Sequence, residues 1–164
     1  MYETFEEIVG RHPELSALRS TGLERSEALR QDLAFLQTID ASLTPLPPCG
    51  RAGMAYREFL LGLVDESLPR FICHYYNHYF AHTAGGRMMG RKLAEALLQG
   101  KTLAFYQWEG DVKELLEAVR RSIDQLAQGW GPEERRACME ETQACFDFGG
   151  SLMSYMKAPG DAPP

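Results

Sequence analysis

Three histidines lie at regular spacing in one stretch of the chain. His74, His78 and His82 are each four residues apart, which places them along one stripe of a helix. Two histidines so arranged can chelate a metal, but a zinc site also needs a carboxylate or thiolate ligand, and no HExxH or paired ExxH motif is present. We therefore assign no metal ligand and favour histidines that are bonded in the core or line a pocket.

Two adjacent glycines, Gly85 and Gly86, interrupt the same helical pattern. In a helix interior they cost about 2 kcal/mol relative to two alanines, so a compensating role is expected. One interpretation is close helix packing or a kink. The other is that the missing side chains let the helix backbone lie against a flat ligand. The aromatic residues that precede the glycines suit either a pocket wall or plain core: Tyr75, Tyr76, Tyr79 and Phe80.

The rest of the chain supplies helices that would position this stretch. Apolar residues recur at helical spacing over residues 2–9, 23–36, 56–64 and 69–98. Helix 23–36 is predicted to be amphipathic, with Arg25 and Asp32 on its polar side. Asp111 caps a helix that ends near Trp130, and Pro132 starts another that reaches about residue 157. No long alternation of apolar and polar residues indicates a strand, so an all-α bundle is predicted.

Composition limits the possible classes of protein. The 164 residues suit one domain, which we place at residues 1–157, with a disordered tail at 158–164. The net charge of -6 disfavours a nucleic-acid partner, and no apolar run approaches the roughly 20 residues of a membrane span. The four cysteines form no CxxC pair and are expected to be reduced thiols.

Residues 71–92 resemble the distal helix of plant and algal heme oxygenases, in the form FICHxYNxYFAHxAGGRMxGRK. The resemblance covers residues 2–156, because further blocks match that family in the same order: YETFEEI, STGLERSEALRQDLAFL, LAFYQWEG and RRACMEETQACFDFGGSLM. It implies a heme oxygenase-like helical bundle. It also implies oxidative cleavage of heme to biliverdin with release of CO and iron, using ferredoxin electrons in the chloroplast. Heme would be both substrate and cofactor.

The resemblance assigns the catalytic region by position. Gly85 and Gly86 would be the distal glycines that permit close approach to the porphyrin. Ala81 and His82 stand where other branches of the family have Gly-Asp. His82 would help proton delivery by hydrogen bonding through water.

Two further assignments keep an alternative. Tyr76 and Arg120 would lie near the heme propionates, although Arg120 can equally belong to a solvated charged face. Arg87, Arg91 and Lys92 would form a docking patch for acidic ferredoxin, or simply a charged helix end.

The resemblance also implies a missing part. Family members carry a helix before the region that matches Tyr2, and that helix holds the proximal histidine ligand of the iron. None of the four histidines aligns with it, so the chain is expected to be an N-terminally truncated bundle. One explanation is that Met1 is internal to a longer protein, whose upstream part also carries the transit peptide. The alternatives are a non-catalytic tetrapyrrole-binding protein, or a helical protein-interaction module that binds no heme.

Overall fold

The computed structural model describes residues 1–46 and 48–154, and no strand occurs among them, which confirms the predicted all-α class. The α-helices are α1 (Tyr2–Arg11), α2 (Ser26–Ile39), α3 (Arg51–Glu66), α4 (Leu68–Ala81), α5 (Arg87–Leu97), α6 (Val112–Leu126), α7 (Pro132–Glu140) and α8 (Thr142–Met153). Short 3-10 turns join them: η1 (Pro13–Leu18), η2 (Ala41–Leu43), η4 (Ala104–Tyr106) and η5 (Ala127–Gly129). The predicted tail at 158–164 lies outside the described residues.

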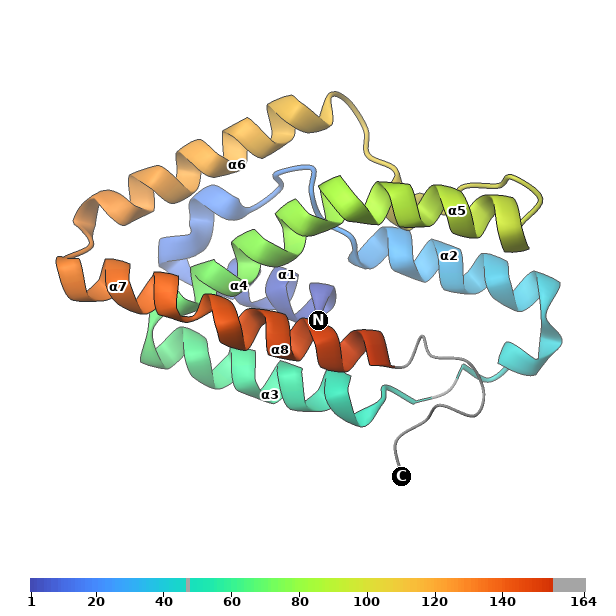
Figure 1. Ribbon diagram of the computed structural model, residues 1–164, viewed down its shortest axis with the longest axis horizontal. Coiled ribbons are helices and arrows are strands. Elements are labelled where there is room, and N and C mark those ends of the chain that lie inside the picture. Colours follow the sequence, from blue (N-terminus) through green and yellow to red (C-terminus); the bar gives the residue numbers. More distant parts are fainter. Residues whose placement is uncertain (47, 155–164) are drawn as a thin grey trace.

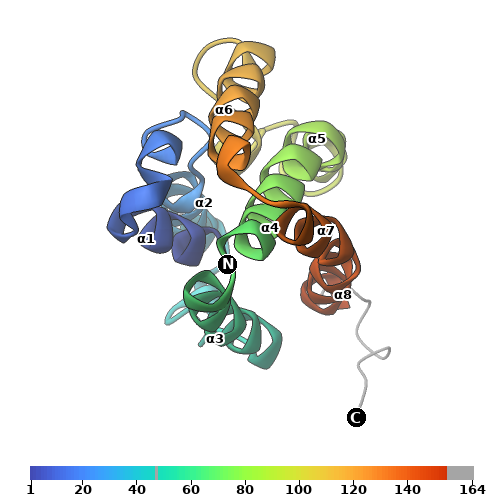
Figure 2. The ribbon, with the colours of Figure 1, turned by 90° about the vertical axis from the view of Figure 1, so that its left-hand side faces the viewer.

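Helix α4 occupies the centre of the molecule (Figures 1 and 2). The end-on view of Figure 2 shows α1 and α2 on one side of α4, α7 and α8 on the other, and α3 below it. Fully buried side chains from α1, α3 and α4 form the core, among them Phe5, Tyr56 and Phe71. In the described part of the chain, no helix combines the length and the apolar character that a membrane crossing requires.

Several helix boundaries follow the predicted signals. Pro69 lies in the first turn of α4, and Pro132 begins α7. The Asp111 carboxylate accepts a hydrogen bond from the backbone N–H of Lys113 at 2.7 Å and so caps α6. Beyond α4 the helical path continues through a π-helical turn, η3 (His82–Gly86), into α5, so the glycine pair marks a local change of winding inside a continuous helical segment.

Two sequence-based expectations are wrong. The helix predicted from Pro132 to about residue 157 is divided into α7 and α8 at Glu141. The reason is tertiary, because the Glu141 side chain is 5% exposed and bonds to α4. Arg25 and Asp32, expected on the exposed face of α2, are buried at 6% and 7% exposure.

Candidate functional site

A cavity of about 630 Å³ lies between the α4–η3–α5 segment and α8. Met1 and Tyr2 close one part of it, and Phe105 and Tyr106 of η4 another. Most of its surface is apolar, which is typical of pockets for cofactors and small molecules. His78 of the histidine stripe lines this cavity, as do four of the residues that the resemblance assigns to the heme site: Ala81, His82, Gly85 and Gly86.

The two glycines of η3 have different surroundings. A Cβ atom added to Gly85 would meet nothing within 4 Å, so the backbone at this position faces open space. A Cβ added to Gly86 would lie 2.5 Å from Nδ1 of His82, which is too close for any real side chain. Gly85 therefore leaves room for a ligand, whereas Gly86 makes room for the ring of His82. The structure thus gives the two glycines different roles in packing, and contact of Gly85 with a ligand stays a prediction.

His82 lies against the wall formed by η4. Its Nε2 donates a hydrogen bond to the backbone carbonyl of Phe105 at 2.8 Å, and the two rings are 4.1 Å apart between centroids. Because a carbonyl can only accept, Nε2 carries the proton and Nδ1 keeps its lone pair. Burial lowers the pKa of His82, so the ring is neutral near pH 7. The side chain thus offers one free acceptor at the cavity.

The η3 turn itself has a conformation that accompanies function in many proteins. Five residues, His82–Gly86, form a single π-helical turn between two α-helices. A π turn loosens the regular hydrogen-bond ladder, and such bulges occur frequently at functional sites. This turn lies along the cavity wall and contains both glycines. The sequence predicted an interruption here but not its form.

Two buried polar residues, one in α2 and one directly before it, hold the wall formed by η4. The Asp32 carboxylate accepts hydrogen bonds from the backbone N–H groups of Ala104 at 2.8 Å and Phe105 at 2.7 Å. The Arg25 guanidinium donates to the carbonyl of Gln107 and lies 4.6 Å from the centre of the Trp108 ring. Sequence reasoning missed this support, because an acid and an arginine on an amphipathic helix look like ordinary surface residues.

The comparisons with known proteins decide the family. The heme oxygenase family profile matches residues 1–154. This chain belongs to the heme oxygenase family. It is 40% identical to heme oxygenase 1, chloroplastic, of Oryza sativa subsp. japonica over 158 residues, which is 95% of this chain and 54% of that relative. The chain spans about half the length of the curated relatives it matches.

Two Arabidopsis thaliana relatives carry different descriptions. Heme oxygenase 1, chloroplastic, is 39% identical, and the match covers 93% of this chain and 54% of that relative. A protein described as probable inactive heme oxygenase 2, chloroplastic, is 36% identical over 93% of this chain and 51% of its own length. Similarity of this kind therefore establishes family membership, while catalytic competence has to be argued from the site.

The two residues assigned to the heme propionates lie together but do not line the cavity. The Tyr76 ring stacks on Phe80 with centroids 4.1 Å apart, and the Arg120 guanidinium lies 5.0 Å from the centre of the same Phe80 ring. Arg120 also pairs with Glu117, one turn earlier on α6. Arg120 is one of the residues around a separate recess between α6 and η3, so its part in heme binding stays a prediction.

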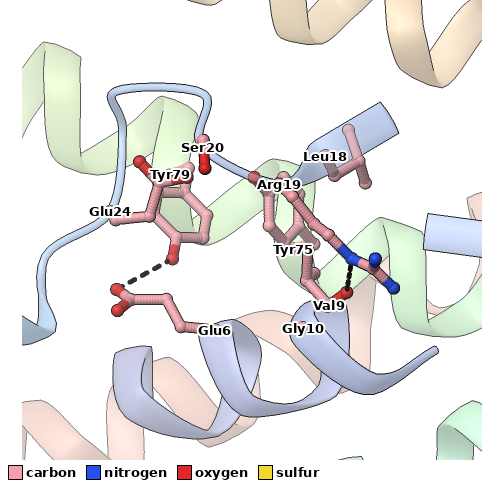
Figure 3. A pocket seen from close by; sticks show the side chains of 9 residues that line it. All are labelled: Glu6, Val9, Gly10, Leu18, Arg19, Ser20, Glu24, Tyr75 and Tyr79. Atoms are coloured by element: carbon pink, nitrogen blue, oxygen red, sulfur yellow. Dashed lines mark hydrogen bonds between the residues drawn. The ribbon is translucent and has the colours of Figure 1, made fainter. Parts of the chain in front are cut away.

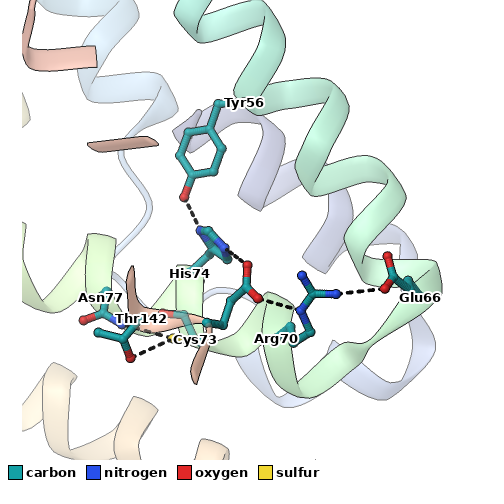
Figure 4. A network of polar contacts seen from close by, with 8 residues as sticks. Tyr56, Glu66, Arg70, Cys73, His74, Asn77 and Thr142 are labelled. Atoms are coloured by element: carbon teal, nitrogen blue, oxygen red, sulfur yellow. Dashed lines mark hydrogen bonds and ion pairs between the residues drawn. The ribbon is translucent and has the colours of Figure 1, made fainter. Parts of the chain in front are cut away.

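A buried polar network fixes helix α4, the N-terminal part of the α4–η3–α5 segment (Figure 4). His74, which is fully buried, forms hydrogen bonds to the Tyr56 hydroxyl at 2.6 Å and to Glu141 at 2.9 Å. Arg70 bonds the other carboxylate oxygen of Glu141 at 2.5 Å and pairs with Glu66 at 2.8 Å. The predicted histidine stripe thus divides: His74 is bonded in the core, and His82 lines the cavity.

A second, smaller cavity of about 270 Å³ lies beside α1 and the opposite side of α4 (Figure 3). One of its two carboxylates, Glu6, accepts hydrogen bonds from the backbone N–H groups of Arg25 at 2.7 Å and Ser26 at 3.0 Å. Glu6 also accepts from the Tyr79 hydroxyl at 3.4 Å. These bonds hold the start of α2, so the polar groups of this cavity serve the fold rather than a ligand.

Proposed function

We propose that this chain forms the distal wall of the heme site in a heme oxygenase that cleaves heme to biliverdin and releases CO and iron. The observation that carries the proposal is the open backbone at Gly85, facing a mostly apolar cavity in a member of this family. A cavity of about 630 Å³ falls within the range of roughly 300–1,000 Å³ that holds cofactor-sized molecules.

The residues present fit a flat, mainly apolar group. The glycine pair and Ala81 leave the helix wall without bulky side chains, so a porphyrin can lie close to the backbone. Phe105 and Tyr106 give an aromatic boundary, and α8 adds further apolar lining. When bound, heme supplies both the iron at which dioxygen is reduced and the ring that is opened.

His82 is the protein group that we assign to proton handling. Its neutral ring has a fixed tautomer, because the Phe105 carbonyl holds the proton on Nε2. The free Nδ1 accepts a hydrogen bond from water in the cavity, and the missing side chain of Gly86 keeps that atom accessible. His82 therefore orients a water molecule at Nδ1, and this water would relay a proton toward the heme-binding part of the cavity.

The plant-type relatives and the surface charge support a proposal for the electron donor and the location. Arg87, Arg91 and Lys92 are exposed on α5, whose residue Met89 lines the cavity. A small basic surface so placed complements an acidic one-electron carrier, and we propose ferredoxin as the donor. The relatives described above are named as chloroplastic, and we propose the same compartment for this protein.

A hemin titration tests the proposal. We expect one hemin per chain with a shifted Soret band, and a histidine-ligated spectrum after imidazole is added as an external iron ligand. Gly85→Leu should abolish binding by filling the open space, whereas Gly62→Leu is the matched control. Gly62 is also a helical glycine with nothing within 4 Å, but it lies in α3, away from the cavity. Biliverdin formation with ferredoxin, its reductase and imidazole would then establish turnover.

Two alternatives correspond to other outcomes. Hemin binding without biliverdin under any of these conditions would favour a non-catalytic tetrapyrrole-binding protein, a possibility favoured by the similarity to the probable inactive relative. No hemin binding, with or without imidazole, would overturn the proposal and leave a helical protein-interaction module as the better account.

A further inference from the structure

A cluster of metal-binding side chains lies at one end of the cavity, beyond the residues assigned to heme. His74 and His78 of α4 and Cys145 of α8 each offer one ligand atom, and these atoms lie within 4.8 Å of one another. The two histidines share one face of α4 because they are four residues apart. The packing of α8 against α4 adds the sulfur atom.

His78 has an unexplained polar atom. Its Nε2 is buried and has no hydrogen-bond partner among the described residues. Leaving such a group unpaired costs on the order of 1–3 kcal/mol, so a native structure needs a reason to retain it. Burial lowers the pKa of His78 to about 4, which keeps the imidazole neutral at pH 7. A neutral imidazole is the form that binds metals.

His74 already has the outer contacts of a metal-ligating histidine (Figure 4). Because Glu141 is paired with Arg70, its carboxylate accepts from Nε2–H of His74, and Nδ1 then accepts from the Tyr56 hydroxyl. A carboxylate on the far nitrogen fixes the ring and its tautomer, as it does for many histidines that bind zinc. A metal ion would take the Nδ1 lone pair in place of the Tyr56 proton.

Cys145 provides the soft ligand and a route to the site. The residue is 3% exposed, yet it lines the cavity together with His78, so an ion can enter from there. Burial raises the pKa of the Cys145 thiol to about 12. On metal binding the S–H bond breaks, the proton passes to water, and a bond from sulfur to the metal forms.

We propose that His74, His78 and Cys145 bind a divalent transition metal of the zinc class, at a site separate from the heme iron. Two imidazoles and a thiolate are ligands that Zn²⁺ takes readily. In a tetrahedral zinc site the ligand atoms lie about 3.5 Å apart, so the cluster must contract by roughly 1 Å, which side-chain rotation can supply. The fourth position is filled by water from the cavity.

Cobalt provides a direct probe of this site. We would titrate the heme-free chain with Co²⁺ and then displace it with Zn²⁺. The expected result is one Co²⁺ per chain, with visible bands of a tetrahedral ion and a near-ultraviolet sulfur-to-cobalt charge-transfer band. Cys145→Ser should remove the charge-transfer band, and His78→Gln should weaken binding at least tenfold. Cys49→Ser, which changes an exposed thiol outside the cluster, should leave both unchanged.

Other results would overturn the proposal. These are the absence of stoichiometric Co²⁺ or Zn²⁺ binding, a charge-transfer band that survives in Cys145→Ser, or a band lost in Cys49→Ser. X-ray absorption of the wild-type zinc complex provides a test that needs no variant: one sulfur and two imidazole nitrogens support the site, and a shell without sulfur excludes it. Because heme is absent throughout, failure here is independent of the hemin titration.

Discussion

The two ends of the continuous α4–η3 segment differ in what surrounds them. At the His74 end, both ring nitrogens are bonded, and the chain of contacts from Tyr56 to Arg70 joins α3 and the α7–α8 corner to α4. At the η3 end, Gly85 faces open space, and Ala81 and the glycines leave part of the helix wall without bulky side chains. Because α4 is held firmly at one end, the backbone at the other end can stay open at Gly85. Stability and ligand access are thus separated along one helix.

The largest loss of stability should come from removing His74, whose hydrogen bonds attach α4 to Tyr56 and Glu141. His74→Ala leaves Tyr56 and Glu141 buried without their partner, and we expect a loss of about 3 kcal/mol in unfolding free energy. Urea unfolding followed by circular dichroism measures it. Met88→Ala on α5, where the side chain is 65% exposed, is the control and should change stability by less than about 0.5 kcal/mol. Equal effects of the two variants would remove the distinction between the ends.

The glycine pair gives the next largest effect, and the two positions should respond with opposite sign. Gly86→Ala forces the His82 ring away from its place and should destabilise by about 2 kcal/mol. Gly85→Ala has room and should stabilise the helix by up to about 1 kcal/mol. The same methyl group projects toward the ligand space, so hemin binding should weaken about tenfold, or ~1.4 kcal/mol. Thermal melts and hemin titrations of both variants measure this.

The outcome at the glycines has a simple control. Gly62→Ala on α3 should stabilise in the same way as Gly85→Ala but leave hemin affinity unchanged. If Gly85→Ala also left affinity unchanged, the open backbone would have no part in ligand binding.

Lowering the pH should reduce the stability of the folded chain through protonation of His82. Its folded pKa lies below the ordinary value of 6.5 because of burial, so below pH 6.5 the unfolded chain binds more protons than the native one. Stability therefore falls as the pH is lowered, by at most about 1.4 kcal/mol per pH unit for one histidine. His82→Gln, which can still donate to the Phe105 carbonyl, should show a shallower slope in unfolding experiments from pH 7.5 to 5. An unchanged slope would contradict a buried neutral His82.

The smallest effect on stability is expected at Arg120, which forms an ion pair with Glu117 on the surface of α6. Arg120 is 42% exposed, and Arg120→Ala should change the unfolding free energy less than any of the other variants. If Arg120 holds a heme propionate, hemin affinity falls several-fold in Arg120→Ala and recovers in part in Arg120→Lys. Titrations at low and high salt measure the effect, because a charge contact weakens with salt. Unchanged hemin affinity would instead assign Arg120 to the solvated face shared with Glu117.

Features that depend on local sequence could be predicted, whereas features that depend on long-range contacts could not. Pro69, Asp111 and Pro132 define helix starts because their effect is on their own backbone. The break at Glu141 and the burial of Asp32 were missed, because each depends on a partner more than 60 residues away. The resemblance singled out Ala81, His82, Gly85 and Gly86 on one helical segment, and these four line the cavity, whereas its lining from η4 and α8 was not predicted.

Position in space was the harder part of the site. Tyr76 and Arg120 both lie against Phe80, yet no sequence pattern shows that they lie outside the cavity of Gly85. The approach of Cys145 to His78 was likewise hidden, since it depends on how α8 packs against α4.

The π turn determines how α5 is rotated about its own axis. Each residue advances an α-helix by about 100°, so the additional residue in η3 rotates α5 by that angle relative to a straight continuation of α4. This rotation places Gly90 directly against the Tyr106 ring and buries Ala94. Deleting one residue from 82–86 would therefore turn α5 about its axis more than it would shorten the chain. The number of residues in this segment is therefore constrained, as is the identity of Gly86, where a Cβ atom would meet the His82 ring.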